Sequence, residues 1–429
     1  MSVSERWQEI RTGFERPFWI ANITELFERL SYYGVQAVLA IYFYKSLHFT
    51  QTQAGDLIGY FGLIVWFLPI FGGTLADWLG FKRSLAFAYA ALSVGYFLLG
   101  SISAPFMASL HRLLSLPHLL LVLLFIPALG PAIVKPCVVG TTARASKENV
   151  RSIGYSIYYT LVNVGGALGP LLASFIGPRY GEANVFRVSA AFAGMMFIVV
   201  LLFFQEPGGA GVSSGSLAEN ILRTLRNFGK VVANIRFMTF LLIFSGFYIV
   251  FWQIYVAFPL YFSTFVPGDV NTARIISVEA FAVISFQVAT TYLTRKLSTF
   301  PAMTLGIFVA GISWLILAAR TNPWAAVGTL FVIAVGEMIQ ASRYYEYVSR
   351  LAPTGQQGTY MGFAFLPIGI GYYVAGKIGG RMVHYFGETM KMPRLVWLTI
   401  AGIGVVTAIL MMIFNALVDP AKNSAPAKP

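Results

Sequence analysis

Three charged residues lie close together in an otherwise apolar stretch near the N-terminus. In the segment "ELFERLSYYG", Glu25, Glu28 and Arg29 are spaced i, i+3 and i+4, and so they share one face of a helix. Each ionised group at the centre of a bilayer costs roughly 2.5–3.5 kcal/mol. If the stretch lies in a membrane, this face must therefore contact other helices or a cavity and not lipid.

The ratio of acids to bases in this segment suggests proton chemistry. An ion pair that only pins a helix needs one acid, but two acids accompany Arg29 here. The surplus carboxylate is able to exchange a proton while Arg29 changes partners, as a proton-coupled carrier requires. A purely structural ion pair is the alternative.

The composition predicts a helical membrane protein that crosses the bilayer many times. The chain has 429 residues, of which 57% are hydrophobic and 11% charged, and its mean hydropathy is +0.71. A soluble protein carries about a quarter charged residues. A helix needs roughly 20 apolar residues to cross a bilayer. Twelve segments qualify, at 18–45, 53–76, 83–103, 116–140, 151–177, 184–205, 236–262, 272–296, 300–319, 322–348, 357–386 and 394–417.

The placement of the basic residues predicts the orientation in the membrane. If the N-terminus is cytoplasmic, 17 of the 30 Lys and Arg residues fall on the cytoplasmic side and 9 on the other. The positive-inside rule then places both termini in the cytoplasm. We expect the protein to lie in the cell (inner) membrane. The N-terminus lacks the blocks of a signal peptide. The net charge of +13 therefore reflects topology, and we expect no nucleic-acid partner.

The least hydrophobic interior stretch divides the chain in two. We expect a six-helix bundle over 1–205, a cytoplasmic linker over 206–235, a second six-helix bundle over 236–418 and a disordered cytoplasmic tail over 419–429. The linker turns basic and amphipathic after its Gly/Ser-rich part, which is typical of a helix on a membrane surface.

A second motif supports an assignment to a transporter class. The segment "GGTLADWLGFKR" at 72–83 resembles the signature loop of the major facilitator transporters at every defined position. This resemblance implies an all-α integral membrane protein with the major facilitator fold, twelve transmembrane helices in two six-helix halves. Such carriers work by rocking the halves around a central cavity.

Further motifs resemble one family within that class. The first-helix segment is similar to the E-x-x-E-R…Y-Y-G motif of the proton-dependent oligopeptide transporters. The segments "WFLPIFGGTLAD", "GPAIVKPCVVG", "YSIYYTLVNVGGALGP", "FW" at 251–252, "GEMIQASRYYEYVSRLAP" and "MGFAFLPIGIGYYVAG" resemble that family's later motifs in the same order. The resemblance spans nearly the whole chain and identifies a divergent member.

The resemblance implies roles for particular residues. Glu25, Glu28 and Arg29 would form the proton-coupling cluster, Lys135 would face the substrate's carboxylate, and Glu337 would receive its α-ammonium. The expected substrate site also contains Tyr32, Tyr33, Gln36, Trp66, Tyr159, Asn163 and Trp252. Two alternatives stay open: hydrogen bonds from Lys135 to carbonyls freed by Pro136, and a permanent ion pair of Glu337 with Arg343 or Lys377.

Several positions depart from the family pattern. Gln36 stands where an arginine is usual, and Val256 stands where the helix-seven motif has a glutamate. Cys137 replaces the asparagine after the helix-four Lys-Pro pair. These departures weaken the set of charged residues that holds the substrate carboxylate in that family. A solute other than an ordinary di- or tripeptide therefore becomes plausible.

These observations leave three hypotheses for function. The first is proton-coupled uptake of di- or tripeptides or peptide-like solutes by alternating access. The second is a major facilitator carrier or exporter of another small solute with altered proton coupling, and the third is a sensor that transports nothing. We expect no enzymatic activity, cofactor or metal, because the four histidines are scattered and no P-loop is present. The expected partners are protons, the substrate and the lipid bilayer, with the protein as a monomer.

Overall fold

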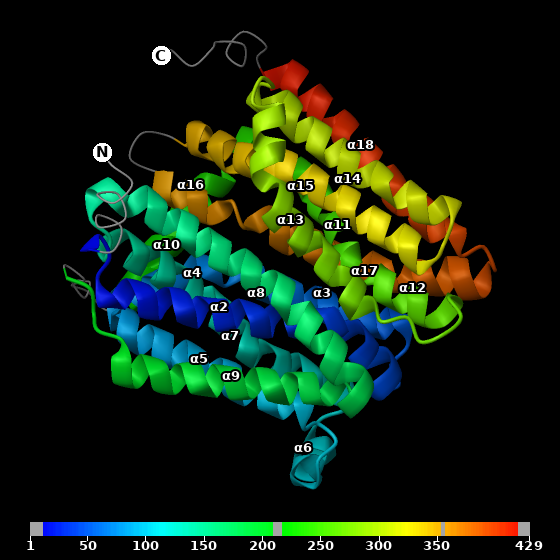
Figure 1. Ribbon diagram of the computed structural model, residues 1–429, viewed down its shortest axis with the longest axis horizontal. Helices are drawn as coiled ribbons and strands as arrows, with labels where there is room; N and C mark the ends of the chain where they lie inside the picture. Colours follow the sequence, from blue (N-terminus) through cyan, green and yellow to red (C-terminus); the bar gives the residue numbers. More distant parts are fainter. Residues whose placement is uncertain (1–11, 209–216, 353–356, 419–429) are drawn as a thin grey trace. The chain divides into compact units, whose positions relative to one another are not determined.

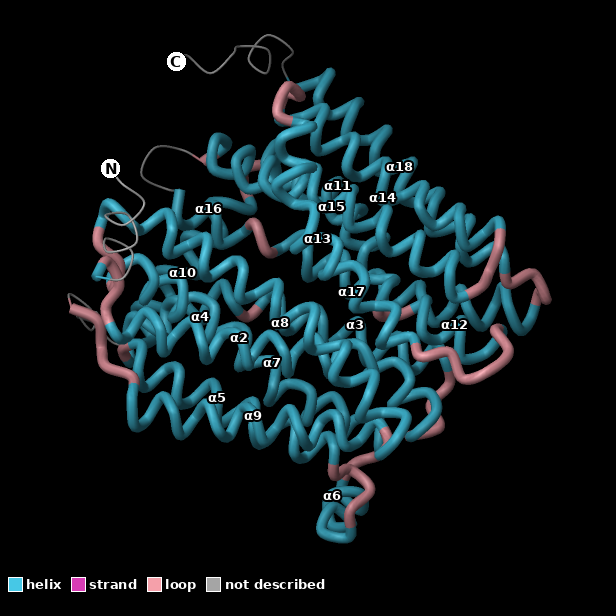
Figure 2. The backbone as a smooth tube through the Cα atoms, in the orientation of Figure 1, coloured by secondary structure: helices cyan, strands magenta, loops and turns pink. Residues whose placement is uncertain are grey.

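The computed structural model of the protein describes residues 12–208, 217–352 and 357–418. Figure 2 shows that these residues are helical almost throughout, with loops between the helices and no strand in the described ranges. Within these ranges the β-type pairing is limited to an isolated bridge between Phe14 and Ser146. Helices of this length satisfy their own backbone hydrogen bonds, which is a requirement within the hydrocarbon of a bilayer.

Each of the twelve predicted segments coincides with a helix or with helices in direct succession. In chain order they are α2 (Arg16–Ile41) with η1 (Tyr42–Ser46), α3 (Gln51–Phe67) with α4 (Pro69–Leu79), α5 (Phe81–Gly100), α7 (Leu116–Arg144), α8 (Arg151–Tyr180), α9 (Glu182–Phe203), α11 (Ile235–Phe251) with η4 (Trp252–Ile254) and α12 (Ala257–Phe265), α13 (Thr272–Thr294), α14 (Thr299–Ala319), α15 (Pro323–Leu351), α16 (Gln357–Phe363) with α17 (Leu366–Met382) and η5 (Val383–Thr389), and α18 (Arg394–Val418). Short connections contain η2 (Pro105–Met107), α6 (Ala108–Leu113) and η3 (Glu148–Val150).

Ten of these helical segments in the described chain are long and apolar enough to cross a membrane. The pair α3 and α4, bent by 45° at a short break, makes an eleventh if it is counted as one span. The remaining segment is α2, which carries the three charges of the first motif. The predicted all-α membrane fold is confirmed.

The chain separates into two compact units. The first contains residues up to Val38 together with Phe67–Leu225, and the second contains Leu39–Trp66 together with the residues from Arg226 onward. The division into two six-helix bundles stays a prediction, and the tail at 419–429 lies outside the described residues. The linker contains α10 (Leu217–Val232), where the amphipathic pattern predicts a helix.

In the first unit, α5 packs along both α7 and α9, and these helices run side by side in Figure 1. The signature loop joins α4 to α5 through Gly80, whose φ of 80° allows a tight turn. The Glu206 carboxylate accepts hydrogen bonds from the backbone N–H groups of Phe81 (2.6 Å) and Lys82 (2.9 Å). An acid that caps a helix N-terminus in this way is stabilised by the helix dipole.

In the second unit, α14 packs against α15 and α18, and α13 packs against α15. The helix α11 contacts α17 and α18. The apolar residues Ala282 and Val283 of α13 meet Ala334 and Met338 of α15 in a buried cluster. These contacts fix the position of α15, which carries Glu337.

One glycine fixes the distance between α8 and the charged helix α2. A Cβ atom placed on Gly165 would lie 2.7 Å from the Cβ of Arg29 and 2.8 Å from the backbone oxygen of Leu26. Only glycine allows this approach, because a backbone atom cannot move aside as a flexible side chain can. Close contact through glycine is a common way for membrane helices to pack.

We predict that Gly165→Val destabilises the protein by about 1–3 kcal/mol, the usual cost of overpacking. Gly402→Val is the matched control, because no atom lies within 4 Å of a Cβ placed at this position on α18. The measurement is the thermal unfolding midpoint of each variant in detergent. Equal midpoints for the two variants would show that the α2–α8 contact does not require glycine.

Candidate functional site

The charged residues of α2 form a buried cluster in the first unit. Glu25, Glu28 and Arg29 are 0%, 2% and 2% exposed. The Arg29 Nε lies 3.4 Å from Glu25 Oε1 and also forms an ion pair and hydrogen bond with Glu28 Oε2. A single guanidinium is therefore shared by two carboxylates, as the spacing of the three residues predicts.

Residues on α5 and α7 surround this cluster. Lys135 of α7 is half-buried and lies within electrostatic range of all three charged residues of α2. The buried residues Tyr89 and Tyr96 of α5 also interact electrostatically with the cluster. With every group ionised, Glu25 and Glu28 balance Arg29 and Lys135, and the four groups carry no net charge.

The aromatic residues after the cluster continue its surface along α2. The Arg29 guanidinium carbon lies 5.1 Å from the centre of the Tyr32 ring, a cation–π contact. The rings of Tyr32 and Tyr33 meet edge to face at 5.2 Å. Tyr32 and Gln36 are buried, whereas Tyr33 is half-buried. The structure therefore brings Tyr32 and Tyr33 together with the cluster, and it places Gln36 in a buried position one turn further along α2.

Tyr159 and Asn163 lie one turn apart on α8, in the same unit. The Asn163 side-chain amide donates to the backbone oxygen of Tyr159 at 2.8 Å. The Tyr159 side chain is exposed and Asn163 is half-buried. These two residues precede Gly165, the point of close contact with α2.

The predicted tryptophans lie together in the second unit. The rings of Trp66 and Trp252 are 6.3 Å apart. The Trp252 ring stacks on Tyr372 at 3.9 Å with an interplanar angle of 5°, and the Trp66 ring stacks on Phe365 at 6.0 Å. Both tryptophans are almost completely buried. This aromatic group offers stacking surfaces, and its packing also holds α3, η4 and α17 together.

Glu337 on α15 belongs to the same unit, and it does not pair with either of the basic residues considered from the sequence. Arg343 donates to the backbone oxygen of Thr294 at 3.3 Å, and Lys377 pairs with Asp56 at 3.1 Å. The charged group that influences Glu337 is Glu279 of α13, another acid. The permanent ion pair considered from the sequence is therefore wrong.

Val256 occupies an apolar environment. Its side chain is fully buried, and a Cβ atom placed on Gly379 of α17 would lie 2.8 Å from it. This packing leaves no room for a charged side chain without a shift of α17. The glutamate that the family has at this position is replaced by a valine, whose side chain packs closely against α17.

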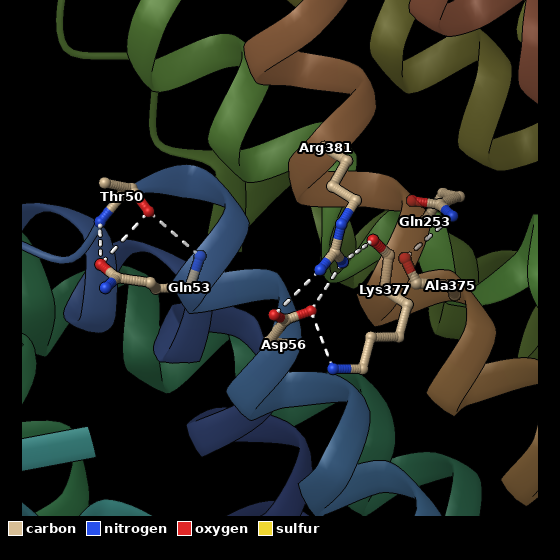
Figure 3. Close-up of polar contacts among 7 residues, drawn as sticks. All are labelled: Thr50, Gln53, Asp56, Gln253, Ala375, Lys377 and Arg381. Carbon is tan, nitrogen blue, oxygen red and sulfur yellow. Dashed lines mark hydrogen bonds and ion pairs between the residues drawn. The ribbon is translucent and has the colours of Figure 1, made fainter.

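A polar cluster that sequence reasoning missed joins α3 to α17 in the second unit (Figure 3). Asp56 Oδ1 lies 2.7 Å from Arg381 Nη1 and 3.1 Å from Lys377 Nζ, and Arg381 Nη2 donates to Asp56 Oδ2 at 3.2 Å. The Lys377 ammonium also lies 4.3 Å from the centre of the Tyr60 ring. One carboxylate thus pairs with two cations, and the three groups together carry a net charge of +1.

Glycines allow the two helices of this cluster to approach closely. A Cβ atom placed on Gly376 would lie 2.4 Å from the Cα of Gly59, and one placed on Gly55 would lie 2.5 Å from the oxygen of Gly376. The pairs Gly55/Gly59 and Gly376/Gly380 follow the small-xxx-small spacing of tight membrane-helix pairs. Because α3 makes these contacts, residues 39–66 belong to the second unit.

Comparisons with known proteins agree with this geometry. The family model described as Major Facilitator Superfamily matches residues 22–366. The chain belongs to the Major Facilitator Superfamily. It is a multi-pass membrane protein, as the helical segments already indicate.

Curated relatives of this superfamily member are peptide permeases. The dipeptide and tripeptide permease B of Salmonella typhimurium is 31% identical, over 53% of this chain and 44% of the permease. The permease B of Yersinia enterocolitica is 23% identical over 94% of each chain. The match to the Salmonella protein spans less than half of that relative's length, whereas the weaker match is almost complete. The resemblance to the oligopeptide transporters is confirmed by these relatives.

Solved structures with the same fold also come from that transporter family. A crystal structure of the peptide transporter POT in complex with sulfate superposes with a TM-score of 0.76 at 18% identity, covering 94% of each chain. A POT family transporter in complex with a thioalcohol-conjugated peptide gives a TM-score of 0.76 at 16% identity, covering 96% of this chain and 97% of the other. At these identities the likeness shows that the major facilitator fold is shared.

Three features of this superfamily member were available in the sequence but were not used. Glu279 is an acid inside a predicted span, and Tyr89 and Tyr96 are phenols seven residues apart on one helix face. Asp56 lies near the start of a span and has no basic neighbour within one helical turn. An inventory of acids and phenols within the spans, beside that of the bases, would have found all three.

We predict that Asp56→Asn lowers stability by up to about 1 kcal/mol, because the cations of α17 lose their partner while partial exposure limits the energy of each pair. The difference in thermal unfolding midpoint between wild type and variant at low salt measures this change. High salt should reduce that difference, because it screens the ion pairs. Asp269→Asn is the control, because Asp269 is exposed and forms no ion pair among the described residues. A cycle with Arg381→Gln measures the coupling energy, and additive effects would mean that the contact contributes nothing.

Proposed function

We propose that this protein is a secondary active transporter that takes up di- or tripeptides, or peptide-like solutes, together with protons by alternating access. The observation that carries the proposal is the group formed by the buried residues Glu25, Glu28 and Arg29 with half-buried Lys135, which has no net charge when all four are ionised. Its relatives named as dipeptide and tripeptide permeases support the choice of substrate. We infer that the protein is not an enzyme.

The charge balance of this group explains how a proton and a carboxylate are bound together. When one glutamate takes up a proton, the group gains a net charge of +1. A buried net charge is costly, so a substrate carboxylate is then attracted to Lys135 or Arg29. The proton and the substrate each favour binding of the other, and this reciprocity is the basis of symport.

The second unit supplies the complementary charge. Glu337 is half-buried and has no basic partner among the described residues, so it is available to a substrate ammonium group. The aromatic residues Trp252 and Tyr372 offer stacking surfaces for side chains of varied shape. We assign the ammonium group of a zwitterionic peptide to Glu337, and its carboxylate to Lys135 or Arg29.

We further propose that both termini lie in the cytoplasm of a cell whose inner membrane holds the protein as a monomer. The excess of basic residues in the predicted cytoplasmic segments supports this orientation. The Asp56–Lys377–Arg381 cluster then lies toward the outer surface, at the start of the second span and the end of the eleventh.

A second candidate function is a carrier or exporter of a different small solute. The burial of Val256 against α17 favours it, because the acid usual at this position in the family is missing. Gln36 is buried on α2 where the family has an arginine. A solute without a carboxylate would not need these groups.

Uptake of labelled dialanine into proteoliposomes tests the proposal. We expect an inward proton gradient to drive accumulation in the wild type, and Glu28→Gln to abolish accumulation while leaving exchange without a gradient measurable, because the variant cannot exchange that proton. Glu148→Gln, at an exposed position in the connection before α8, is the control. If folded protein accumulates no dialanine under any gradient, peptide uptake is contradicted. The carrier or exporter of a different solute is then the remaining candidate.

A further inference from the structure

One face of α8 carries polar side chains along the first half of the helix. Five exposed residues form this polar face: Ser152, Tyr155, Ser156, Tyr159 and Thr160. They lie within a helix that is long and apolar enough to span a membrane. Residues three, four or seven positions apart share one face of a helix, so the five side chains point to the same side. Tyr159 belongs to the predicted substrate site, whereas the other four have no role in the scheme above.

The same face changes character halfway along α8. Residues seven positions apart stay on one face, because two turns of an α-helix contain about 7.2 residues. Ser152 and Tyr159 are exposed, and the next two residues in this register, Gly166 and Ala173, are buried. The face is therefore open and polar in the first half of the helix, and covered and built from small residues in the second half.

This change occurs at the level of the charged cluster of α2. Asn163 is half-buried, and Gly165 follows two residues later. A Cβ atom placed on Gly165 would lie 2.7 Å from the Cβ of Arg29. Between Ser152 and Asn163 the helix rises roughly 16 Å, which is about half the thickness of the hydrocarbon core of a bilayer. The polar face therefore extends from near the start of the span to the level of Arg29.

Lipid contacts a different face of α8. The exposed side chains further along the helix include Leu168 and Phe175, which are apolar and 40% and 49% exposed. At about 100° per residue, Leu168 points about 140° away from Asn163. A helix that exposes apolar side chains on one face and polar side chains on another lies between two media. The apolar face fits lipid, and the polar face fits water.

The hydrogen bonds of the polar face show which kind of contact it offers. Ser156 Oγ donates to the backbone oxygen of Ser152 at 3.1 Å, and Thr160 Oγ1 donates to that of Ser156 at 2.8 Å. The Asn163 amide donates to the backbone oxygen of Tyr159 at 2.8 Å. Because these donors already have partners within the helix, a passing solute makes only weak contacts with them. A path needs such weak and repeated contacts, since the solute must leave as readily as it enters.

We propose that the polar face of α8 borders a water-filled path between the cytoplasm and the charged cluster of α2, along which protons and the substrate leave. Ionisable groups at this depth need water to exchange a proton with the cytoplasm, and Ser156 and Thr160 line the path between the two. The cytoplasmic end of the path and the identity of the substrate rest on the proposed function, whereas the contact of this face with water does not.

Cysteine labelling tests the contact with water. The chain has one cysteine, Cys137, which is buried, so the wild-type protein measures the background. Ser156→Cys and Thr160→Cys should react with a charged, membrane-impermeant methanethiosulfonate at least tenfold faster than Leu168→Cys, because the reactive thiolate forms in water and not in lipid. Equal rates for the variants on the two faces would overturn the proposal.

The same variants test the side of the membrane and the solute. In vesicles of known orientation, reagent on the cytoplasmic side should label Ser156→Cys at least tenfold faster than reagent on the other side, and the reverse order would overturn the cytoplasmic path. Saturating dialanine should slow this labelling about threefold, because the solute occupies the path, and should leave Phe175→Cys unchanged. Fast cytoplasmic labelling that dialanine does not slow would refute the peptide substrate and support the water-filled path.

Discussion

The structure depends on one constraint, the cost of an ionised side chain in a hydrocarbon interior. Arg29 meets it by sharing its guanidinium between two carboxylates and the face of Tyr32. This compensation works only where other helices exclude lipid from the charged face. Gly165 contributes to this exclusion of lipid, because it lets α8 lie directly against α2 at the level of Arg29. The close packing of these helices is therefore a consequence of the charges and not independent of them.

The two units meet the same constraint in different ways. In the first unit, two acids and two bases neutralise one another around α2 and α7. At the α3–α17 contact of the second unit, Asp56 serves two cations that are partly exposed to solvent, where charge is tolerated more easily. Each solution leaves a different residual charge, and residual charge is what a carrier offers to its substrate.

Much of the fold and part of the site follow from local sequence patterns. Apolar length located all twelve helical segments, and the i, i+3, i+4 spacing placed Glu25, Glu28 and Arg29 in contact. Contacts between helices that are distant in sequence could not be predicted in this way. Nothing near Asp56 indicates that Arg381 is its partner, and nothing near Glu337 indicates Glu279, because these interactions depend on the packing of α3 on α17 and of α13 on α15. The alternative to the family reading, a pair of Glu337 with Arg343 or Lys377, was wrong for the same reason, since both bases have other partners.

The replacement of an acid by Val256 also has a physical explanation in this arrangement. Val256 allows η4 and α12 to pack closely on Gly379 of α17, a contact within the second unit. Lys135 in turn lies within range of Glu25 and Glu28 on α2, within the first unit. Each unit therefore meets its own packing and charge requirements locally, without an acid at position 256.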